Sequence, residues 1–122
     1  MKTKHFPILL LLSLASFTAQ SGDVEITQAT ASKTGSGTYR FAVTLKHQDT
    51  GWEHFANKWE VRGQDGTLYG SRELLHPHVN EQPFTRSLSN VKIPSHIKSV
   101  VIRAYDSVHG QSPQEFQVSL PE

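Results

Sequence analysis

The sequence contains no cysteine, and its single methionine is the first residue. No disulfide can support the fold, so the apolar core has to do so alone. The same absence excludes metal sites built on a thiolate or, beyond residue 1, on a thioether, and the blue-copper site is therefore excluded. It also leaves no cysteine that could carry a lipid anchor.

Apolar runs long enough to cross a membrane are also missing. The longest run, residues 6–15, has about ten residues, whereas a spanning helix needs roughly 17–25. Two lysines precede this run, and the small residues Ala19 and Ser21 stand three and one positions before a cut at Gly22. This arrangement is typical of a secretory signal peptide. We therefore predict that residues 1–21 are a signal peptide and that the mature protein is periplasmic or secreted, without a membrane span.

Neither sign of charge dominates. The chain has 12 Lys and Arg against 11 Asp and Glu, and loss of the two lysines of the signal leaves it close to neutral. A near-neutral chain argues against nucleic acid or an anionic membrane surface as the main partner. The length of residues 22–122 predicts a single domain.

No window has the periodicity of an amphipathic helix, and alternation with a period of two recurs instead. Residues 39–45 alternate large apolar with polar or small side chains, which predicts a strand with one buried face. Similar segments lie at 24–30, 58–62, 67–75, 84–88, 99–105 and 116–120, with turn signals between them. Seven such segments predict an all-β fold, an immunoglobulin-like or fibronectin-III-like seven-stranded antiparallel β-sandwich.

Antiparallel strands alternate in direction, so every second connection lies at the same end of the sandwich. The connections after the second, fourth and sixth strands should share one end with Gly22, and we expect loops of about eight to ten residues there. Five of the six histidines after residue 21 fall at that end: His47, His54, His76, His78 and His109. Only His96 falls at the other end.

Loops from three connections can bring several imidazoles to one ion, which favours a metal site. Imidazole is the commonest protein ligand of Zn²⁺ and Cu²⁺. Pro77 favours extended backbone at His76, so that His76 and His78 point the same way. We predict a divalent copper or zinc ion held by His54, His76, His78 and His109, with Glu81 or Asp106 as a further ligand or an orienting group. His47 is expected at the surface.

Two other functions could use the same end. Trp52, Phe55 and Phe84 lie beside polar groups and could receive a peptide, a protein or a glycan. The string 106–109 holds a carboxylate, a hydroxyl and an imidazole, but a catalytic triad needs them in one line. Since the Gly-x-Ser-x-Gly elbow is also absent, we expect a binding protein with a carrier or accessory role and not an enzyme.

Arg86 shares strand parity with Phe84, which is expected to face inward. A charged group on that face needs a partner. We therefore predict that Arg86 pairs with Glu81 or Asp106.

The strings HPHVNEQPFTRS at 76–87 and DSVHG at 106–110 resemble those of a group of short secreted bacterial proteins of unassigned function. The segment 49–52, followed by His54, fits the same pattern. The resemblance covers nearly all of the mature chain and implies an exported single sandwich. A looser similarity is to periplasmic copper-resistance β-sandwich proteins of the copper-carrier type. Those commonly begin with a histidine, where this chain has Gly22.

Overall fold

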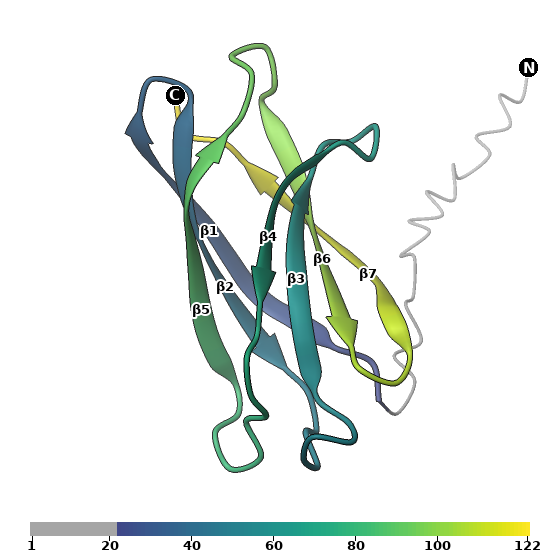
Figure 1. The fold of residues 1–122 in the computed structure, drawn as a ribbon. Coiled ribbons are helices and arrows are strands. Elements are labelled where there is room, and N and C mark those ends of the chain that lie inside the picture. The colour runs from purple at the N-terminus through teal and green to yellow at the C-terminus, as the bar shows by residue number, and fades with distance from the viewer. Residues whose placement is uncertain (1–21) are drawn as a thin grey trace, which may run out of the picture.

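The computed structural model describes residues 22–122, which form seven antiparallel strands and no helix (Figure 1). The strands are β1 (Glu25–Gly35), β2 (Thr38–Lys46), β3 (Ala56–Arg62), β4 (Leu68–Glu73), β5 (Phe84–Lys92), β6 (Ser99–Asp106) and β7 (Gly110–Ser119). The all-β prediction is confirmed. The predicted signal peptide lies outside the described residues, and these residues include no helix that could span a membrane.

The strands form two sheets, with the orders β1-β2-β5 and β4-β3-β6-β7. Figure 1 shows the two sheets as facing layers. β4 pairs with β3 and not with β5, whereas the fourth strand of a constant-type immunoglobulin domain lies in the sheet of the first, second and fifth. The finer assignment to an immunoglobulin-like or fibronectin-III-like sandwich stays a prediction.

The core lies between the sheets and follows the predicted alternation. In β2, Phe41 and Val43 are fully buried, and their neighbours on the other face are not. Trp59 in β3 is the largest fully buried side chain. Burial of such a side chain stabilises the fold by about 1.5–3 kcal/mol, which lets the core replace the missing disulfide.

Three strands are longer than the alternation indicates. β1 continues to Gly35 and β7 begins at Gly110, because backbone pairing with β2 and β6 continues where apolar alternation has ended. β5 continues to Lys92, although the predicted segment ends at residue 88. Val91 is buried and pairs with Tyr39 after a register shift in the β2–β5 ladder.

The predicted sharing of one end by alternate connections is confirmed. Residues 47–55, 74–83 and 107–109 lie at one end together with Gly22, at the bottom of Figure 1, and His96 lies in the connection at the opposite end. We call the end that contains Gly22 and these three connections the histidine end. The β6–β7 connection has only three residues, fewer than expected, because Asp106 caps a tight turn there.

Candidate metal centre

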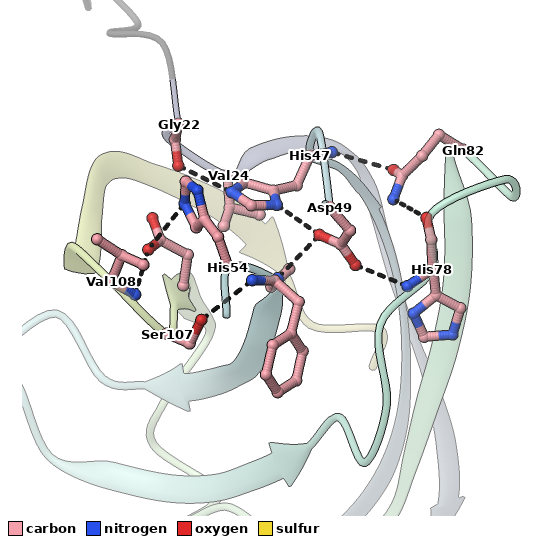
Figure 2. A network of polar contacts seen from close by, with 12 residues as sticks. Gly22, Val24, His47, Asp49, His54, His78, Gln82, Ser107 and Val108 are labelled. Carbon is pink, nitrogen blue, oxygen red and sulfur yellow. Dashed lines mark hydrogen bonds and ion pairs between the residues drawn. The ribbon is translucent and has the colours of Figure 1, made fainter. Parts of the chain in front are cut away.

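His47 follows β2 directly and is buried, only 3% exposed, so its predicted surface position was wrong. Its Nδ1 lies 2.5 Å from Asp49 Oδ1, and its Nε2 lies 2.9 Å from the carbonyl oxygen of Gly22. Figure 2 shows the ring between these two partners. The side chain is therefore held at both nitrogens, by a loop carboxylate and by the start of the described chain.

Asp49 is a buried carboxylate that ties the loops of the histidine end together. Besides His47, it accepts hydrogen bonds from the backbone N–H of Ala56 at 3.0 Å and of His78 at 2.8 Å. Gln82 makes a second link, since it accepts from the His47 backbone N–H and donates to the His78 carbonyl (Figure 2). The β2–β3 and β4–β5 loops are thereby fixed relative to each other.

His54 sits on a compact turn of the β2–β3 loop. A bridge between Gly51 and His54, with a hydrogen bond from Thr50 N–H to the His54 carbonyl, closes this turn. The buried Nε2 of His54 lies 3.4 Å from Asp106 Oδ1 and has no hydrogen-bond partner. A buried polar atom without a partner is uncommon, and here it faces a carboxylate.

Asp106 ends β6 and is buried. Burial by itself raises the pKa of its carboxyl. The backbone N–H groups of His109 and Val108 and the His109 side chain donate to the carboxylate, and together they hold its pKa below the usual value. The group is consequently ionised at neutral pH, as a metal ligand must be.

One ligand atom each from His47, His54 and Asp106 lies within 4.8 Å of the other two. Around a tetrahedral ion with bonds of about 2.0 Å, neighbouring ligand atoms are about 3.3 Å apart. The 3.4 Å between His54 and Asp106 already matches this value. The other distances between the ligand atoms, at most 4.8 Å, would shorten to about 3.3 Å with side-chain movements of about 1.5 Å or less. The three groups could therefore hold a metal ion.

His109, a predicted ligand, lies on the rim of this group. Its Nδ1 is 3.1 Å from Asp106 Oδ2, and its ring centroid is 5.0 Å from that of His54. The side chain is 48% exposed. His109 is thus a half-exposed neighbour of the three-residue group.

The other predicted ligands lie elsewhere at the same end. The His78 ring stacks on Phe84 at 4.0 Å and contacts His76, while Glu81 is exposed. Among residues 22–122, the group of converging ligand atoms includes none of these three predicted ligands. The structure therefore divides the predicted single site between two places.

Arg86 occupies Nε2 of His78, whereas the buried Nδ1 of the same ring has no hydrogen-bond partner. Its Nη2 lies 2.8 Å from His78 Nε2, and because a guanidinium can only donate, Nε2 must accept. The expected pairing of Arg86 with Glu81 or Asp106 was wrong. A charge on the inward-facing side of β5 is instead satisfied by a neutral imidazole and by the Thr85 carbonyl.

Acid should destabilise the fold through His78. Burial lowers the pKa of His78, and the charges of Arg86 and His76 lower it further. The unfolded chain then takes up the proton first, so stability falls as the pH drops below about 6.5. We expect chemical denaturation to show a smaller loss of unfolding free energy between pH 7.5 and 5 for His78→Gln than for the parent. Equal losses in the two proteins would show that His78 is not involved.

The loops of the histidine end also carry exposed apolar side chains. Trp52 is 69% exposed and packs edge-on against Phe55, and Leu75, Val79 and Val108 are also exposed at the histidine end. Phe84, predicted to join the aromatic surface, is buried instead beneath the His78 ring. The apolar surface is therefore built from loop tips and not from a strand.

The hydroxyl of Ser107 faces the backbone and not an imidazole. Its Oγ accepts the Phe55 N–H at 3.0 Å (Figure 2). His109 Nδ1 faces Asp106 instead. Ser107 and Asp106 thus stabilise the turn and the start of β3. The expectation that the protein is not an enzyme stays a prediction.

No protein-family model matches the chain, and no solved structure matches it. A protein of Halomicrobium mukohataei named "Putative lipoprotein" is 35% identical over 96 residues. The match covers 79% of this chain and 47% of that protein. The chain thus spans about half the length of this relative.

Proposed function

We propose that His47, His54 and Asp106 bind a divalent transition metal ion, copper or zinc, and that the protein is an exported metal carrier or accessory protein. The observation that carries this proposal is the buried His54 Nε2, which has no hydrogen-bond partner and lies 3.4 Å from the Asp106 carboxylate. An ion between the two would give His54 Nε2 the partner that it lacks.

The chemistry of the three groups fits a borderline metal. Two imidazoles and one carboxylate suit Zn²⁺ and Cu²⁺. Asp49 occupies Nδ1 of His47, so Nε2 becomes the ligand nitrogen once it releases the Gly22 carbonyl, and Asp49 gives the ring the carboxylate partner common at metal-bound histidines. Three protein ligands leave at least one position open for a further ligand, which suits an ion that is taken up and passed on.

The proposed location is outside the cytoplasm, where the protein would be secreted, periplasmic or attached to a membrane. The signal-like residues 1–21 support this location, as does the name "Putative lipoprotein" of the Halomicrobium relative.

A second candidate function is recognition of a peptide, a protein or a glycan at the histidine end. The exposed Trp52, Leu75, Val79 and Val108 favour it, since large apolar side chains gathered on loop tips are typical of a contact surface. This function is compatible with metal binding, because a metal carrier must also contact the partner that delivers the ion or the partner that receives it.

Thermal unfolding with added metal tests the proposal. We expect Zn²⁺ or Cu²⁺ to stabilise the protein starting at Gly22 by about 2.7 kcal/mol when free metal is 100 times Kd, and a chelator to reverse the gain. His54→Ala should remove most of it, whereas His96→Ala at the opposite end should not. Acid should weaken binding below about pH 6, where imidazoles protonate.

Two results would contradict the proposal. One is the absence of any shift with either metal. The other is a gain that His76→Ala removes as completely as His54→Ala, which would place the ion in the neighbouring β4–β5 loop.

A further inference from the structure

Gly22 lies among three imidazoles. Its carbonyl oxygen is 2.9 Å from His47 Nε2. A methyl group on its Cα would lie 2.7 Å from His109 Cε1 and 3.3 Å from His54 Cε1. The first described residue therefore hydrogen-bonds to one proposed metal ligand, His47, and leaves no room for a side chain beside the rings of His54 and His109.

The residues after Gly22 hold it in this position. The Val24 N–H donates to Ser112 Oγ at 2.8 Å, and the Ile26 N–H donates to Gln114 Oε1 at 2.7 Å. Gln114 also donates back to the Ile26 carbonyl at 3.0 Å, and both apolar side chains are buried. These hydrogen bonds attach the start of the described chain to β7.

The conformation of Gly22 is one that suits glycine alone among ordinary residues. Its φ is +103°, in the region that side chains disfavour. A Cβ would also meet the His109 ring at less than 3 Å. A residue without a side chain thus allows the backbone to approach the imidazoles closely, which is the arrangement that a backbone ligand requires.

Removal of residues 1–21 would change the chemistry at this point. Hydrolysis of the Ser21–Gly22 peptide bond consumes one water, leaves a carboxylate on Ser21 and releases a primary amine on Gly22. An amide nitrogen is a poor metal ligand, but an amine has a free lone pair, and it forms a five-membered chelate ring together with the carbonyl oxygen of its own residue. The 2.9 Å between that oxygen and His47 Nε2 is close to the separation of about 2.8–3.3 Å between neighbouring ligands of one ion.

We infer that cleavage before Gly22 completes the metal site, because the released α-amine and the carbonyl of Gly22 bind the ion together with His47, His54 and Asp106. This inference rests on the proposed function and adds its regulation. The precursor has the imidazoles but not the amine, so it binds metal weakly, and tight binding begins only after the protein has been exported and processed. The ion is then acquired outside the cytoplasm.

The test compares the protein beginning at Gly22 with a matched form that retains Ser21 with its α-amine acetylated. Calorimetry should give a Kd for Cu²⁺ at least about tenfold lower for the first form, since even loss of an outer partner of a metal ligand costs about 10–100-fold. Both forms should melt at the same temperature without metal, which shows that the extension leaves the fold intact. In the EPR spectrum of the Cu²⁺ protein, ¹⁵N-glycine labelling should alter the nitrogen hyperfine pattern of the Gly22 form alone.

The outcomes separate the two proposals. Equal Cu²⁺ affinity in both forms, without an effect of ¹⁵N-glycine, overturns the role of the amine and leaves metal binding standing. Absence of binding in both forms overturns the two together. Terminal sequencing of the exported protein gives one more check, because a first residue other than Gly22 would also refute the inference.

Discussion

Replacing Asp49 by alanine is expected to lower the free energy of unfolding by about 3–5 kcal/mol. The carboxylate is buried and accepts from His47 and from the backbone N–H groups of Ala56 and His78. Its removal leaves these donors without an acceptor in a site that water does not reach, and each such group costs about 1–3 kcal/mol. Part of this cost is recovered by relaxation of the two loops that Asp49 connects.

Urea denaturation of purified variants at pH 7 measures this effect. Asp49→Asn should cost less than Asp49→Ala, because the amide keeps one acceptor oxygen for the three donors. Glu81→Gln serves as the control, since Glu81 is exposed on the same end and its loss should change stability by about 0.5 kcal/mol at most. A cost below about 1 kcal/mol for Asp49→Ala would contradict the assignment of Asp49 as the link between the loops.

The second large effect is expected for metal binding by Asp106→Asn. An asparagine keeps an oxygen that can accept from the Val108 and His109 N–H groups, so the β6–β7 turn should persist. It loses the negative charge that a divalent ion requires. If Kd rises 100-fold, the stabilisation by metal falls from about 2.7 to about 0.4 kcal/mol at the same free metal concentration.

Melting curves with and without Zn²⁺ give this difference directly. The matched control is Glu53→Gln, an exposed carboxylate on the β2–β3 loop, which should keep the full metal-dependent gain. An unchanged gain in Asp106→Asn would remove Asp106 from the ligand set. A large loss of stability without metal would instead mean that the negative charge, and not only the acceptor oxygen, is needed for the turn.

The strands were predictable because burial of one face gives an alternation of apolar and polar residues along the sequence. Phe41, Val43 and Leu45 in β2 are the clearest case, and all three are buried. The ends of β1, β5 and β7 were not predictable in this way. In β1 and β7, pairing at these ends is carried by backbone hydrogen bonds between mostly polar residues, which leave no hydrophobic period. In β5, a register shift separates the buried Val91 from the earlier alternation.

Alternation of strand direction was sufficient to place Gly22, His54, Asp106 and His109 at one end. It could not separate His54 from His78, because the end of a sandwich is wide enough for two clusters, and the Arg86–His78 contact depends on side-chain geometry. The burial of His47 did have a signal in the sequence. His47 shares the parity of the buried residues of β2, so the inward-facing side continues beyond the strand.

A crystal structure of the protein beginning at Gly22, grown with Zn²⁺ and measured at the zinc absorption edge, tests metal binding most directly. The expected result is an anomalous peak about 2.0–2.2 Å from His54 Nε2, His47 Nε2 and an Asp106 oxygen. A peak bound instead between His76 and His78, or no peak at the histidine end in crystals soaked with excess zinc, would contradict the proposed centre.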